Sequence, residues 1–336
     1  MTKARELAEL GDTLTVDGSG NITVGGTITG TTITASSALA GSLSTAAQGN
    51  VTSLGTLTGL TVSGNLSVDG GTIKLDGNYP VENGNVALGN AALDAVTTNG
   101  AYNTALGSEA LTDNTTGSRN TAVGQGGLAD NTSGSYNTAV GRESLFSNTT
   151  ASNNTAVGYQ SLYANTTGTE NVAVGKGALD ANTTANNNTA LGTNGLTNNT
   201  TGTELTAVGS NSLNDNTTGN YNTSVGVNAL GDNTTGDNNT AIGRQALRLN
   251  TTASNNTAVG YLAIYANTTG SALTAVGVAA LDANTTGIDN TAIGVSALGG
   301  NTTGSYNVAV GRAVLLNSTT ASENTAVGYQ ASGYNT

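Results

Sequence analysis

Residues 154–158 read Asn-Thr-Ala-Val-Gly, and this word or a close variant returns every 17 residues over the last three quarters of the chain. Its glycine stands at Gly107, Gly124, Gly141, Gly158, Gly175, Gly192, Gly209, Gly226, Gly243, Gly260, Gly277, Gly294, Gly311 and Gly328. Gly89 opens the series one residue out of step. A short fixed period indicates one small structural unit stacked many times. The sequence therefore predicts an elongated repeat protein, a class that holds, spaces or adheres more often than it catalyses.

Each repeat follows one pattern around its glycine, which we number position 0. Position −1 is Val, Leu or Ile, position −2 is Ala except at Ser224, and position −4 is Asn except at Leu205 and Leu273. Position +4 is Leu in most repeats, and an Asn-Thr-Thr or Asn-Thr-Ser triplet begins at position +7 in twelve of them. β-Branched residues and a recurring glycine disfavour helix. Each coil is thus predicted as strand, glycine bend, second short strand and polar loop, although the segment around Leu145 or Leu281 could instead form one helical turn.

The strand word alternates with a period of two, so Thr and Val face one way while Asn and Ala face the other. We expect Val157 and Leu162 to point into the core of their coil. The bends that repeat between coils are expected at Gly124, Gly141, Gly158 and Gly175. One Val and one Leu per coil bury little apolar surface against the entropy of ordering 17 residues. Neighbouring coils and neighbouring chains must supply the rest, and the Ala face would let another chain approach, which predicts a homotrimer.

Composition excludes several classes of function. The 336 residues include no Cys, His or Trp, and only 9% are charged, with a net charge of −12. Zinc-finger chemistry, thiolate nucleophiles and histidine bases are therefore absent, and we predict no catalytic residue, cofactor or metal site. The acidic balance argues against nucleic acid as a partner. No apolar run is long enough to insert into a membrane.

The chain divides into three segments by composition. Residues 1–10 contain the one strongly helix-favouring stretch and are predicted to dock onto a larger assembly. Residues 11–84 hold short alternating runs separated by Asp-Gly and Gly-Asn turns, which predict a thin β-rich stalk. Residues 85–336 form the repeat shaft. The overall fold class predicted is an all-β parallel β-roll or β-solenoid with 17-residue coils, trimeric and preceded by the stalk.

The repeat resembles the YadA-like head repeat of trimeric autotransporter adhesins, which fold as trimers of parallel β-rolls. The 17-residue form, as in residues 154–169 (NTAVGYQSLYANTTGT), looks more like repeats of bacteriophage tail-fibre proteins. The runs at residues 3–8 (KARELA) and 52–70 (TSLGTLTGLTVSGNLSVDG) look like the parts of marine phage fibres nearest the virion. We expect an autotransporter to carry a signal peptide and a membrane anchor, and we recognise neither here. The resemblance therefore implies a virion fibre that works outside the cell.

Exposed aromatic residues are the candidate contacts with a host receptor. Tyrosines recur at position −5 and directly after the bend, and rings of this kind stack on sugars. These candidates are Tyr102, Tyr136, Tyr159, Tyr221, Tyr261, Tyr306 and Tyr329. Packing between loops or subunits is the other reading of the same rings. We interpret Asp113, Asp130, Asp215 and Asp232, which share position +6, as a solvated edge rather than a calcium site, and the Asn-x-Thr triplets as turn residues rather than glycosylation acceptors.

Together these features predict a non-catalytic structural fibre of a virion, a phage tail fibre or a similar appendage, that provides reach and host-surface attachment. Its expected partners are two further copies of itself, other virion proteins through the N-terminus, and a host-surface glycan or protein. The alternative from another class is a cellular surface adhesin or a self-assembling extracellular filament.

Overall fold

The structure is a computed structural model that describes residues 14–16, 22–24, 84–97 and 99–332. The chain divides into two compact units, Met1–Gly70 and Gly71–Thr336. In the first unit, β1 (Leu14–Val16) pairs antiparallel with β2 (Ile22–Val24). These two strands were predicted as parts of the stalk. The docking segment at residues 1–10 and the rest of the stalk up to residue 83 lie outside the described residues.

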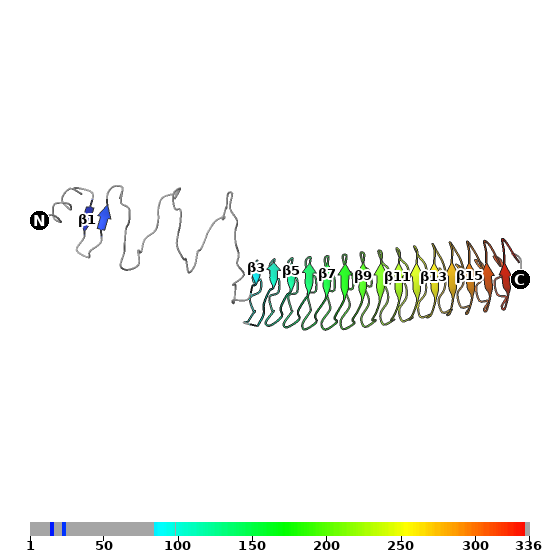
Figure 1. Cartoon of the computed structure of the whole chain (residues 1–336), viewed down its shortest axis with the longest axis horizontal. Coiled ribbons are helices and arrows are strands. Elements are labelled where there is room, and N and C mark those ends of the chain that lie inside the picture. The colour runs from blue at the N-terminus through cyan, green and yellow to red at the C-terminus, as the bar shows by residue number, and fades with distance from the viewer. Residues whose placement is uncertain (1–13, 17–21, 25–83, 98, 333–336) are drawn as a thin grey trace. The chain divides into compact units, whose positions relative to one another are not determined.

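The second unit contains one parallel sheet of 15 strands, and each strand comes from one coil (Figure 1). The strands are β3 (Val86–Leu88), β4 (Thr104–Leu106), β5 (Thr121–Val123), β6 (Thr138–Val140), β7 (Thr155–Val157), β8 (Val172–Val174), β9 (Thr189–Leu191), β10 (Thr206–Val208), β11 (Thr223–Val225), β12 (Thr240–Ile242), β13 (Thr257–Val259), β14 (Thr274–Val276), β15 (Thr291–Ile293), β16 (Val308–Val310) and β17 (Thr325–Val327). Their spatial order follows their order in the sequence.

Every strand pairs with the equivalent residues of the next coil. Thr155 lies opposite Val172 and Val157 opposite Val174, a register of 17 residues, and only the first pair of strands is offset by 18. This confirms the predicted parallel β-solenoid with 17-residue coils, in about 14 turns. At a strand spacing of about 4.8 Å, 14 steps give a solenoid about 67 Å long.

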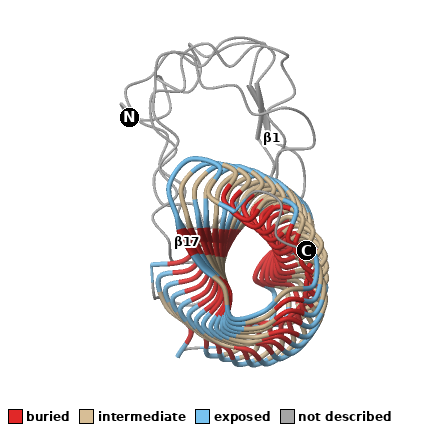
Figure 2. Ribbon diagram, turned by 90° about the vertical axis from the view of Figure 1, so that its right-hand side faces the viewer, coloured by how far each residue is buried: buried red, intermediate tan, exposed pale blue. Residues whose placement is uncertain are grey.

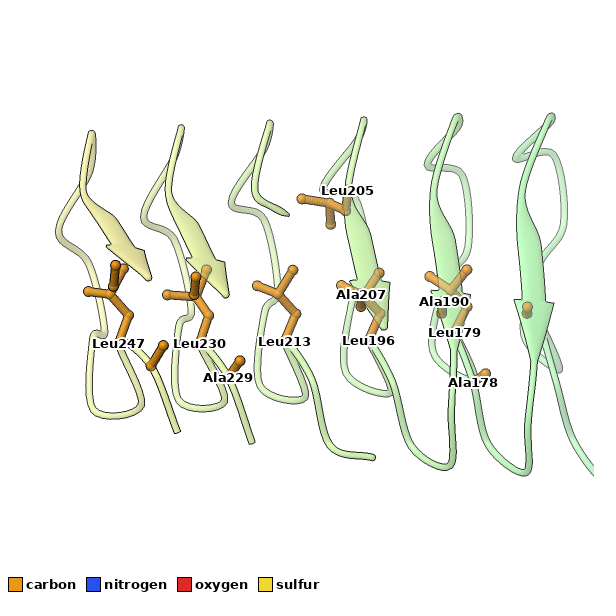
Figure 3. Close-up of a cluster of buried hydrophobic side chains, with 14 of the residues drawn as sticks. Ala178, Leu179, Ala190, Leu196, Leu205, Ala207, Leu213, Ala229, Leu230 and Leu247 are labelled. Carbon is orange, nitrogen blue, oxygen red and sulfur yellow. The ribbon is translucent and has the colours of Figure 1, made fainter. Parts of the chain in front are cut away.

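The inner face of the strands carries Ala, not Val. Ala156 and Leu162 are fully buried, whereas Val157 is only half-buried on the outer face of the sheet. The expectation for Leu162 is thus confirmed and that for Val157 is wrong, as is the expectation that Ala faces another chain. Buried residues gather along the inner side of the coils in Figure 2, and the position +4 leucines of successive coils stack in a row in Figure 3. Opposite this Leu the inner strand position holds only a small side chain, Ala in most coils and the fully buried Ser224 in one.

The wall that follows the bend is not a second strand, and no helix occurs among the described residues. It is a series of turns in which positions +2 and +4 take positive φ, for example Gln160 at 52° and Leu162 at 52°. Backbone bonds between coils persist, because the N–H of Leu162 donates to the carbonyl of Ala178 at 2.9 Å. A left-handed conformation costs a non-glycine residue about 1–2 kcal/mol. We attribute its retention in every coil to these bonds and to the burial of Leu.

The bend requires glycine, as predicted. Gly158 has φ 135°, and a Cβ placed on it would lie only 2.6 Å from the carbonyl oxygen of Gly175 in the next coil. The same close approach recurs at Gly124, Gly141 and Gly175. A side chain at any of these positions would push successive coils apart.

Two rows of buried asparagines form the polar half of the interior. Asn165, at position +7, donates from Nδ2 to Oδ1 of Asn148 in the preceding coil and to the carbonyl of Gly168, each at 3.0 Å. Asn154, at position −4, donates to the same carbonyl at 2.8 Å. The position +7 row is unbroken from Asn114 to Asn301. The Asn of each triplet is thus a structural residue with no exposure to solvent.

Candidate binding surfaces

The outer sheet face, defined as positions −3 and −1 of β3 to β17, is an apolar stripe along the solenoid. Its exposed aliphatic residues, each between 36% and 69% exposed, are Leu88, Val140, Val172, Leu191, Val225, Ile242, Val276, Ile293, Val308 and Val327. Three exposed valines at position +1 widen the stripe: Val227, Val278 and Val295. Parallel sheets are normally covered on both faces, and exposed apolar patches of this kind mark interaction sites.

All seven candidate tyrosines are exposed, between 39% and 68%. They do not form one site, because they occupy two rows on either side of the strands. Tyr102, Tyr136, Tyr221 and Tyr306 precede a strand, and Tyr159, Tyr261 and Tyr329 follow the bend after one. Any contact they make with a receptor would therefore be distributed along the solenoid.

Arginines cover part of these rings. The guanidinium carbon of Arg119 lies 5.5 Å from the ring centre of Tyr102 and 5.2 Å from that of Tyr136, and Nη1 donates to the Tyr136 hydroxyl at 2.9 Å. Arg142 lies 5.8 Å from the ring centre of Tyr159, one coil away. Such cation–π contacts stabilise neighbouring coils. These contacts were not predicted from the sequence, although an Arg and a Tyr that lie 17 residues apart indicate them.

The wall formed by positions +2, +5 and +6, which we name the turn wall, carries two hollows. The first has a volume of about 300 Å³. It is lined by Ala91, Glu109, Thr112, Asp113, Ala129, Asp130 and Phe146. The second has a volume of about 240 Å³. It is lined by Asn211, Asn214, Asp215, Asn228, Gly231, Asp232 and Arg248. The sequence pattern showed the four aspartates at position +6 but not the hollows.

Burial perturbs three carboxyl groups on the turn wall. It raises the pKa of Asp130 above its ordinary value, with a further contribution from the negative charge of Asp113. Burial also raises the pKa of Asp180 and of Asp282. Within the described ranges, no group of three or more Asp, Glu, His or Cys residues is arranged to hold a metal ion.

No described helix is long and apolar enough to cross a membrane. No protein family, curated protein or solved structure matches the chain.

Proposed function

We propose that the chain is a structural fibre of a virion, a phage tail fibre or similar appendage, that provides reach and host-surface attachment without catalysis. The observation that carries this proposal is the unbroken stacking of 15 strands from β3 to β17, with equivalent residues paired in every step. Such stacking builds a long, stiff shaft from one short repeated unit, since each coil contacts only its neighbours. The virion is the proposed location, and the fibre works outside the cell.

The fibre is proposed to be a homotrimer held together through the outer sheet face. Apolar residues recur on this face in every coil, at a spacing of about 4.8 Å. Only a partner with the same rise per coil can match every row, and a further copy of the chain meets that condition. Three copies around an axis parallel to the solenoid would cover the face of each. The proposed trimer interface is thus formed by the Val, Leu or Ile at position −1, and not by the Ala at position −2 as the sequence suggested.

Two further kinds of partner are proposed, each for a different part of the chain. The N-terminal segment is proposed to dock onto other virion proteins. The exposed tyrosine rows are proposed to contact a host-surface glycan or protein, where weak contacts repeated along three chains would act through avidity.

Solution mass tests the assembly. Light scattering coupled to size exclusion should give the full chain a mass three times 32.9 kDa. The double variant Val157→Asp, Val174→Asp should have the mass of one chain and an unchanged far-ultraviolet circular dichroism spectrum. The matched control, Thr167→Asp with Thr184→Asp in the exposed loops, should remain trimeric. A wild-type mass of one chain would refute the trimer.

Location tests the function itself. Peptides of this chain should be found in purified virions by mass spectrometry, and gold-labelled antibody should bind their tails or appendages. Labelling of the cell envelope or of free filaments, with virions unlabelled, would instead favour the cellular adhesin or extracellular filament.

A further inference from the structure

The two hollows of the turn wall occupy equivalent positions six coils apart. Asp113 corresponds to Asp215 and Asp130 to Asp232, and these four are the only aspartates at position +6 in the repeat. In each hollow a small residue, Ala129 or Gly231, stands at position +5 among the lining residues. Residues 149–168 also recur closely at residues 251–270, six coils later, so a duplication of coils accounts for the two aspartate pairs, while the other lining residues differ.

The first hollow joins carboxylates to an aromatic wall. The side chains of Glu109, Asp113 and Asp130 form no ion pair or hydrogen bond with any other described residue. The ring of Phe146 stacks on Tyr163, with ring centres 5.5 Å apart, and is held in place by that contact. The hollow thus offers free acceptors beside an apolar ring face.

The second hollow has the same aspartate pair in a more neutral lining. Asp215 accepts hydrogen bonds through Oδ1 from Asn198 and Asn214, and Asp232 accepts one through Oδ1 from Nε of Arg248 at 2.9 Å. The other oxygen of each aspartate accepts no bond within the described part of the chain. Two further amides, of Asn211 and Asn228, line the same space.

We propose that the two hollows are carbohydrate-binding sites at corresponding positions of the repeat, each taking one sugar unit and holding its hydroxyl groups on the paired aspartates. Carboxylates only accept hydrogen bonds, and sugar hydroxyls donate them. Phe146 supplies a stacking face in the first site, and amides and Arg248 supply donors in the second. A metal ion does not suit the pair: Glu109 also lines the first hollow, but among the described residues no three carboxylates are arranged to hold a metal ion. An ammonium group does not suit both sites, because Arg248 already pairs with Asp232.

The distance between the two sites would allow one polysaccharide chain to bind both of them. Six coils at about 4.8 Å place the hollows about 29 Å apart on one wall. A polysaccharide that reaches both sites binds the second without a new encounter, which raises its avidity over a single sugar by a factor of about 10² to 10⁴. This inference rests on the proposed attachment function and names the chemistry of its receptor.

The experiment uses the full chain and a panel of methyl glycosides of glucose, galactose, mannose, rhamnose and N-acetylglucosamine, with glucosamine and calcium chloride as competing probes. Titration calorimetry should give two sites per chain for at least one glycoside. Asp130→Ala and Asp232→Ala should each remove one site, and the double variant should remove both. Asp289→Ala, which removes an exposed carboxylate from another wall, should bind like the wild type.

Filling the hollows tests the proposal without removing a charge. Ala129→Gln and Gly231→Gln should each abolish one site, and the variant that combines them should abolish both. Both should fold because position +5 already holds Tyr163 and Tyr265 elsewhere, and at Gly231 the end of the Arg248 side chain shifts to admit the new residue. On a biosensor coated with a polysaccharide of the bound sugar, each single variant should lose at least tenfold in affinity.

Three results would overturn the proposed sites: no glycoside binding, glycoside binding that survives in the Asp130→Ala, Asp232→Ala double variant, or binding of glucosamine or calcium alone. If the protein binds sugar but is absent from virions, the proposed fibre function is refuted and the proposed sites stand. If it is a trimer in virions but binds no sugar, the proposed sites are refuted and the fibre function stands.

Discussion

Replacing Asn165 by Asp should destabilise the solenoid severely, although the two side chains have nearly the same shape. Nδ2 of Asn165 donates to Oδ1 of Asn148 and to the carbonyl of Gly168, each at 3.0 Å, in a site with no solvent exposure. An aspartate places an acceptor against both partners. The Gly168 carbonyl keeps its bond from Asn154, whereas Oδ1 of Asn148 loses its one donor.

The size of the effect follows from these contacts. Two lost hydrogen bonds contribute about 0.5–1.5 kcal/mol each, and one newly orphaned buried acceptor costs about 1–3 kcal/mol. Burial of the carboxylate adds to this, so we expect a loss of about 3–5 kcal/mol at pH 7. Burial should also raise the pKa of the new carboxyl group in the folded state. Its protonated form can donate to Asn148, so part of the lost stability should return as the pH falls through that raised pKa.

Chemical denaturation of the full chain, followed by circular dichroism at pH 7 and pH 4, measures both effects. The control is Asn187→Asp, the same change at an exposed loop position, and it should stay within about 0.5 kcal/mol of the wild type. Equal unfolding midpoints for the two variants at pH 7 would refute the structural role of the asparagine row. A loss that does not depend on pH would refute the account of the buried carboxyl group.

Three further outcomes are expected. Leu162→Asp should unfold the surrounding coils because it buries an unpaired charge, whereas Val157→Asp should preserve the circular dichroism spectrum; equal losses would show that the inner face is misassigned. Ser318→Asn should stabilise the chain by about 1 kcal/mol in denaturant titrations, because Oδ1 of Asn301 and Oγ of Ser318 are buried without partners where the asparagine row ends; a lower midpoint would contradict this. Burial raises the pKa of Asp180 in the folded state, so its contribution favours folding near pH 4 and is lost as the pH rises. Asp180→Asn should therefore raise the midpoint at pH 7 and flatten its pH dependence between pH 4 and 7, and an unchanged profile would exclude burial of this carboxyl group.

The candidate surfaces were only partly readable from the chain. The tyrosine rows follow directly from the period, since residues 17 apart must lie on the same line of the solenoid. The hollows do not, because each is lined by residues of several successive coils, with a small position +5 residue beside a larger one. The shape of each hollow depends on the side-chain conformations along the turn wall; the ring of Phe146, for example, lies over Gly126 of the preceding coil.

The sequence by itself determined the period, the parallel register and the bends. A 17-residue repeat with a glycine in every unit stacks in one way, since equivalent residues must meet and a Cβ on Gly158 would collide with the next coil. Alternation in the Thr-Ala-Val word also separated two strand faces. It did not show which face is inside, because Ala and Val are both apolar and either row can close a core.

Only the tertiary structure decided that question. Once the turn wall brings Leu162 into the coil, the remaining space opposite admits Ala156 and excludes Val157. The left-handed residues that direct Leu162 inward are unfavourable alone and carry no sequence signature of their own, since Gln, Glu, Asn and Ala all occur at position +2. Bonds to the neighbouring coils keep them in place, and these exist only after the coils have stacked.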